Sequence, residues 1–212
     1  MAVTKSTAKS RKVTISGTPE ICKDCVLAKA KKASVPKEKV DLSKVPGERL
    51  FINISSPSER SIGGNRHWLL VLDDYSDFPM SFFLSHKDML KTKLVPLIKS
   101  LKLQGTNAKI IRCDNAGENI AFERAAEQEG LNLKFEYTAP DMPQQNGRVE
   151  RKFQTLYGRV QAMLFSAEQE MGIKNIKKLW CEAAETATQY DGIFGERWRD
   201  FELFSEILWE GI

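Results

Sequence analysis

The stretch Arg112–Lys152 decides the fold: it reads RCDNAGEN at residues 112–119 and TAPDMPQQNGRVERK at residues 138–152. Asp114 follows an apolar pair and therefore lies at the carboxyl end of a predicted strand. Glu150 lies in the first turn of a predicted helix, because an Asn-Gly pair just before it is typical of a turn that opens a helix. Thirty-five residues separate the two acids.

Two carboxylates that converge from a strand end and a helix start repel each other unless a cation lies between them. Mg²⁺ suits this position, since it prefers oxygen ligands and is usually held by one or two carboxylates together with a substrate phosphate. Two such ions, about 3.5–4 Å apart, stabilise both the attacking and the leaving oxygen of a phosphoryl transfer.

Two segments carry a resemblance to a known family. The segment DNAGE at residues 114–118 and the segment PQQNGRVERK at residues 143–152 resemble the catalytic core of retroviral-type integrases, most closely that of copia-type LTR retrotransposons. In that family the first segment supplies the second metal-binding Asp, here Asp114, and the second supplies the Glu, here Glu150. The resemblance covers roughly residues 22 to 190. It implies an RNase H-like fold, DNA strand transfer with Mg²⁺ or Mn²⁺ in a two-metal site, DNA as partner and homo-oligomerisation.

One position departs from the family pattern. The resemblance places the first catalytic Asp within residues 50–57, where this chain has Asn53. An Asn offers one neutral carbonyl oxygen and an NH₂ donor, with no negative charge. We therefore expect a two-metal site that is weakened, with Asp114 and Glu150 as its charged ligands and Asn53 as a weak one.

Asp73 and Asp74 are the nearest candidates to replace the missing charge. If the first two strands pair as a hairpin around residues 57–66, Asn53 faces Leu69 or Leu70. Asp73 then lies about 10–13 Å along the strand from Asn53, too far for direct replacement. We expect these aspartates to cap the following turn instead.

Hydrophobic periodicity predicts an α/β domain with a mixed five-stranded sheet in the order β-β-β-α-β-α-β-α, flanked by helices, as the RNase H-like fold requires. Pro96 is expected to bend or split the first helix. The predicted elements are strands at 50–55, 67–72, 80–84, 109–113 and 132–137 and helices at 88–103, 118–129, 147–171 and 176–190.

The chain divides by composition into three parts: a basic N-terminal arm at 1–46, a catalytic domain at 47–190 and an atypical aromatic tail at 191–212. Residues 1–50 carry 12 Lys and Arg against 5 Asp and Glu, a net charge of +7, whereas the whole chain carries +4. Such an arm is expected to be disordered. It either contacts DNA phosphates or is only a solvated tail.

Cys22 and Cys25 form a CxxC pair, which is half of a tetrahedral zinc site. The two histidines of the chain, His67 and His86, both lie downstream inside the predicted core. We therefore interpret the cysteine pair as a zinc-site remnant and do not expect zinc.

The polar residues around Glu150 are candidates for DNA binding. Amide side chains can donate to phosphates or base edges, and basic side chains can pair with phosphates. The alternative is that the amides only form the turn and that the cations are solvated. The candidates are Gln144, Gln145, Asn146, Arg148, Arg151 and Lys152.

Other classes of protein fit less well. No apolar run is long enough for a membrane span, and the N-terminus lacks the apolar core of a secretory signal. Four cysteines do not suggest a disulfide framework, so we expect a nuclear or cytoplasmic protein.

Three interpretations remain open from the sequence. The chain is an integrase core active in strand transfer, a folded but inactive copy that still binds DNA or oligomerises, or another RNase H-like nuclease or transposase. Asn53, the absent zinc histidines and the atypical tail favour the second interpretation for activity itself.

Overall fold

A computed structural model describes residues 43–106, 108–138, 146–172 and 175–194, all within a unit that spans Asp41–Ile212. Several sequence predictions lie outside the described residues: the basic arm with Cys22 and Cys25, the loop residues Gln144 and Gln145, and the end of the aromatic tail.

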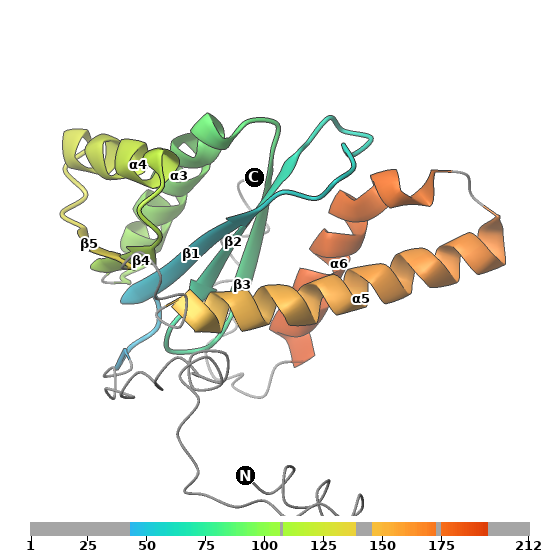
Figure 1. The fold of residues 1–212 in the computed structure, drawn as a ribbon. Helices are drawn as coiled ribbons and strands as arrows, with labels where there is room; N and C mark the ends of the chain where they lie inside the picture. The colour runs from blue at the N-terminus through green and yellow to red at the C-terminus, as the bar shows by residue number, and fades with distance from the viewer. Residues whose placement is uncertain (1–42, 107, 139–145, 173–174, 195–212) are drawn as a thin grey trace, which may run out of the picture. The chain divides into compact units, whose positions relative to one another are not determined.

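The described residues form the predicted α/β domain, with helices packed on a five-stranded mixed sheet (Figure 1). Every predicted strand and helix is present, with small shifts at the ends. The elements are β1 (Arg49–Ser55), β2 (His67–Asp73), β3 (Pro79–Leu84), η1 (Lys87–Met89), α3 (Leu90–Leu103), β4 (Ile110–Cys113), α4 (Gly117–Gln128), β5 (Lys134–Tyr137), α5 (Gly147–Met171), η3 (Ile176–Leu179) and α6 (Trp180–Phe194).

The strand order is β3-β2-β1-β4-β5. β1, β2 and β3 form an antiparallel meander, whereas β4 pairs parallel to β1 and β5 pairs parallel to β4. The observed pairing of Asn53 with Leu70 confirms the predicted hairpin register.

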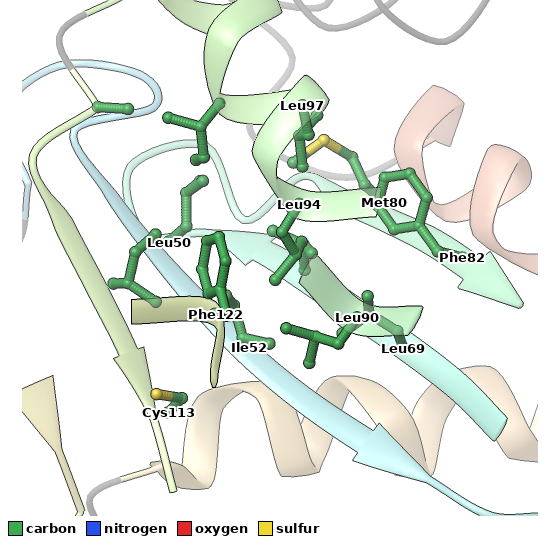
Figure 2. Packing of buried hydrophobic residues seen from close by; sticks show 14 of the residues in the cluster. Leu50, Ile52, Leu69, Met80, Phe82, Leu90, Leu94, Leu97, Cys113 and Phe122 are labelled. Atoms are coloured by element: carbon green, nitrogen blue, oxygen red, sulfur yellow. The ribbon is translucent and has the colours of Figure 1, made fainter. Parts of the chain in front are cut away.

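Two hydrophobic clusters cover the two faces of the sheet. Because side chains alternate along a strand, Leu50 and Ile52 of β1 point to one face and Phe51 to the other. The first cluster, drawn in Figure 2, joins the sheet to α3 and α4 through residues such as Leu94 and Phe122. The second cluster joins the opposite face to α5 and α6. The domain is therefore a three-layer α/β/α structure (Figure 1).

Of the two effects expected of Pro96, the split is wrong, because α3 runs continuously from Leu90 to Leu103 with Pro96 inside. A bend at Pro96 stays a prediction. A proline removes one backbone hydrogen bond, whose acceptor would be the carbonyl of Thr92. Both residues lie on the exposed side of α3, where water can satisfy that carbonyl. The buried side of the helix, including Leu94 and Leu97, keeps its packing.

The last helix differs from its prediction in two ways. Its first turn, Ile176–Leu179, is a 3-10 helix, and α6 continues to Phe194 rather than ending at Tyr190. Among the described residues, no helix combines the length and apolar character that crossing a membrane requires.

Helix α3 offers a matched test of the first cluster. Leu94 is 1% exposed and packs on the sheet, whereas Leu103, at the end of the same helix, is 89% exposed. Leu94→Ala is expected to lower the free energy of unfolding by about 2–5 kcal/mol because it leaves a cavity. Leu103→Ala is expected to change it by less than about 0.5 kcal/mol. Urea denaturation of the two variants decides; equal effects would contradict the packing described.

Candidate functional site

Asn53 lies on the face of the sheet that α5 covers. On β1, Phe51 belongs to the α5–α6 cluster, while Ile52 and Ile54 pack with the opposite cluster. Side-chain alternation therefore directs Asn53 toward α5. The next residue on that face, Ser55, confirms the direction, since its Oγ accepts a hydrogen bond of 2.8 Å from Tyr157 of α5.

Asp114 is brought next to Asn53 by the parallel pairing of β1 and β4. The observed partners Leu50–Ile111 and Phe51–Arg112 set the register, and the paired stretch ends there. Extending the same offset by two residues aligns Asn53 with Asp114, which directly follows the end of β4. Neighbouring strands are about 4.8 Å apart. The guanidinium of Arg112 lies 5.9 Å from the centre of the Phe51 ring, so Arg112 shares the α5 face and Asp114 follows it by two residues. The side chain of Asp114 is exposed.

Glu150 is brought alongside the same part of β1 by two contacts that bracket it on α5. The Asn146 side chain, one helical turn before Glu150, donates a 3.4 Å hydrogen bond to the Ile52 carbonyl. Tyr157, two turns after Glu150, bonds Ser55. Residues spaced by four and seven share one side of a helix, so Glu150 faces β1 between Ile52 and Ser55. Its side chain is half-buried.

These residues supply two carboxylates and one amide at the carboxyl end of the central strands. Within the described residues, no group of three or more His, Cys, Asp or Glu side chains is placed to hold a metal ion, and the third member here is the amide of Asn53. All three side chains present oxygen atoms, the donors that Mg²⁺ and Mn²⁺ prefer. The donor set therefore fits one divalent cation well and a pair of cations less well.

Cys113, directly before Asp114, does not join this donor set. Burial, reinforced by the negative charges of Asp114 and Glu123, raises the pKa of its thiol to about 12. A protonated thiol is not a metal ligand. Cys113 packs in the first cluster instead.

A comparison with curated proteins finds a relative among retrovirus-related polyproteins. Over 142 residues, 65% of the chain, the sequence is 30% identical to the Retrovirus-related Pol polyprotein from transposon TNT 1-94 of Nicotiana tabacum. The matched region spans 10% of that polyprotein. No protein-family model matches the chain.

One solved structure supports the fold. A chain of the simian T-cell lymphotropic virus intasome, solved in complex with PP2A regulatory subunit B56 gamma, has a TM-score of 0.56 at 15% identity, over 79% of this chain and 55% of that one. The domain has an integrase-core fold. The HTLV-2 integrase catalytic core, solved with magnesium, has a TM-score of 0.46 at 12% identity, over 68% of this chain and 84% of that one.

The two aspartates considered as substitutes for Asn53 serve other purposes. Asp73 pairs with Leu50, at the opposite end of β1 from the site. Its carboxylate accepts hydrogen bonds from the backbone of Gly47 and from the backbone and hydroxyl of Ser76, so it caps the β2–β3 turn as predicted. Asp74 accepts from Arg148 and Arg49.

A network of ion pairs holds the first two turns of α5, and two of the predicted DNA-binding cations belong to it. Arg148 pairs with Asp74 and with Asp77, and Lys152 bridges Asp77 and Asp191 at 2.7 and 2.8 Å. The network links α5 to the β2–β3 turn and to α6. This role cannot be read from the sequence, because the acidic partners lie far from α5 along the chain.

The other predicted DNA-binding residues within the described part of the chain differ in exposure. Asn146 is 4% exposed, and its side chain donates a hydrogen bond to the Ile52 carbonyl of β1. Arg151 is exposed on the first turns of α5. Their contacts with DNA, and those of Arg148 and Lys152, stay predictions.

A pair of arginines on α5 tests the network. Arg148→Met is expected to lower the free energy of unfolding by about 3 kcal/mol, because Asp74 is 2% exposed and loses a charged partner. Arg151→Met, three residues along the same helix, is expected to change it by less than about 0.5 kcal/mol. Chemical denaturation near pH 7 measures both. An Arg148 variant as stable as the Arg151 variant would show that the pairing with Asp74 contributes nothing.

Proposed function

We propose that this domain is the core of a retrotransposon-type integrase that binds DNA and transfers DNA strands with a divalent cation, and that Asn53 makes the reaction slow. Two features of the fold support the proposal. The β1–β4 register, extended by two residues, aligns Asn53 with Asp114. The two contacts that bracket Glu150 lie on the side of α5 that meets the same part of β1. The sequence match to a retrotransposon Pol polyprotein supports the same family.

Each residue has a chemical task in this proposal. Asp114 and Glu150 hold the cation through their carboxylates, and Asn53 adds one neutral oxygen. When bound, Mg²⁺ or Mn²⁺ stabilises the charge that develops on the phosphodiester and orients the attacking hydroxyl or water. The chain's own residues fix where this happens. Glu150 is held by the seating of α5 on β1, and Asp114 by the end of β4.

The amide of Asn53 sets the expected rate. A site with two negative charges in place of three neutralises the cations less well, so their binding weakens. Each 1.36 kcal/mol lost from transition-state stabilisation costs about tenfold in rate. The same amide favours a second candidate function, a folded domain that binds DNA and associates with itself without strand transfer.

DNA is the proposed partner, and the protein is proposed to act inside the cell. Arg151 is an exposed cation on the first turns of α5, near Glu150. The N-terminal residues 1–50 hold the excess positive charge of the chain. Phosphate contacts by such cations provide affinity that does not depend on DNA sequence and that falls with salt.

Restoring the missing charge tests the catalytic proposal. The variant Asn53→Asp is expected to raise Mn²⁺-dependent strand transfer on an oligonucleotide substrate by at least about tenfold, because it returns the third carboxylate. Asn175→Asp makes the same chemical change at an exposed position before η3 and is expected to have no effect. Asp114→Asn in the Asn53→Asp background is expected to abolish the gain.

Two results would count against the proposal. Full activity of the unmodified chain, unchanged in Asn53→Asp, would show that position 53 does not limit the reaction. Absence of activity in both proteins, with DNA binding intact, would favour the second candidate function.

Salt dependence tests the nucleic-acid partner. Binding of the full chain to double-stranded DNA, followed by fluorescence anisotropy, is expected to weaken steeply between about 50 and 200 mM salt. Deleting residues 1–42 leaves every described residue in place and is expected to remove most of the binding. Binding that ignores salt, or that survives the deletion unchanged, would contradict the role of the basic arm.

A further inference from the structure

The carboxylate of Asp114 accepts a hydrogen bond from a residue outside the candidate donor set. Asn119, in the first turn of α4, donates from Nδ2 to Oδ1 of Asp114 at 2.6 Å and to the backbone carbonyl of Asp114 at 3.2 Å. The backbone N–H of Ala116 donates to the same Oδ1 at 3.2 Å. A hydrogen bond to an ionised acceptor is roughly twice as strong as a neutral one.

The orientation of the Asn119 amide follows from chemistry. Both atoms that it meets on Asp114 are acceptors, and only the NH₂ group of an amide can donate to them. Asn119 is 4% exposed, and within the described residues its Oδ1 is buried without a hydrogen-bond partner. A buried carbonyl oxygen without a hydrogen-bond partner costs folding free energy. The hydrogen bonds from Asn119 to Asp114 therefore form despite the cost of burying the Asn119 Oδ1.

The start of α4 is held in place independently of this amide. Lys87 of η1 pairs with Glu118 at 3.1 Å, and Phe122 is fully buried in the first cluster. The N-cap residue, Ala116, makes no side-chain cap. The hydrogen bonds from Asn119 to Asp114 therefore act on the candidate site and are not what holds the start of α4 in place.

We propose that Asn119 is a positioning residue that fixes the Asp114 carboxylate so that Oδ2 is the oxygen presented to a divalent cation. Both side-chain hydrogen bonds described for Asp114 end on Oδ1, so Oδ1 is occupied and Oδ2 is the oxygen left for coordination. A carboxylate held in one rotamer binds a cation without first losing conformational freedom. This inference rests on the proposed function, because it gives Asp114 the role of a ligand.

The experiment measures Mn²⁺ affinity of the full chain by electron paramagnetic resonance, in the natural sequence and in Asn53→Asp. Asn119→Leu keeps the side chain's approximate shape and removes the donor. Its Mn²⁺ affinity is expected to fall about tenfold or more, the usual effect of losing a residue that orients a metal ligand. Gln128→Leu, an exposed amide on the same helix, is the matched control and is expected to leave the affinity unchanged.

A second variant tests whether a loss of Mn²⁺ affinity comes from misfolding. Asn119→Ser is smaller and polar, and it is too short to make the 2.6 Å bond, so it is expected to show the same loss in a protein whose circular dichroism is unchanged. A residue that only stabilised α4 would lower the urea midpoint without changing the Mn²⁺ affinity of the folded protein. Unchanged Mn²⁺ affinity in folded Asn119→Leu and Asn119→Ser overturns the inference.

Asp114→Asn distinguishes a failure of the positioning role of Asn119 from a failure of the cation site itself. If it weakens Mn²⁺ binding while the Asn119 variants do not, the inference fails and the proposed cation site stands. If Asp114→Asn also leaves Mn²⁺ binding unchanged, the cation site itself fails and takes the inference with it.

Discussion

The parallel pairing of β1 with β4 is the constraint on which the candidate site depends. It joins strands that are 61 residues apart at the observed partners Phe51 and Arg112, and both strands end at the same edge of the sheet. Parallel strands need a crossover connection, which here runs through β2, β3 and α3. A one-residue slip would turn Asn53 away from α5 and into the cluster with α3 and α4. The buried neighbours Leu50 and Ile52 oppose that slip, since it would remove their side chains from the cluster that packs on α3 and α4.

Helix α5 is the second requirement, and it is held by polar contacts as well as by packing. Val149 and Phe153 seat it on the sheet through the second cluster. Apolar packing alone leaves a helix free to rotate or slide by small amounts, whereas directional bonds fix its position. The Arg148 and Lys152 ion pairs hold one side of the first turns, and the Asn146 bond to Ile52 holds the side that carries Glu150. Residues that look like a DNA-binding surface in the sequence thus also stabilise the fold that positions the acid.

The sequence predicts the elements of this fold well, because β2 is apolar from Trp68 to Leu72 and helices such as α4 end at a glycine. It also predicts the hairpin register, since pairing centred on the connection at residues 57–66 gives the observed partner of Asn53, Leu70. It does not predict continuity through Pro96, which depends on whether that face of α3 meets water. Nor does it predict Asp77, Asp191 or Asn119 as partners of the site, because these contacts depend on distances between elements that no local pattern encodes.

Positions 53, 114 and 150 are proposed to share one divalent cation. Paramagnetic broadening of backbone amide signals by Mn²⁺, in a ¹⁵N-labelled sample of the full chain, tests this proposal most directly. The signals of Asn53, Asp114 and Glu150 are expected to broaden together as Mn²⁺ is added, and Asp114→Asn is expected to remove all three effects at once. Broadening confined to one of the three positions, or centred on the acidic side chains Asp77 and Asp191, would contradict it.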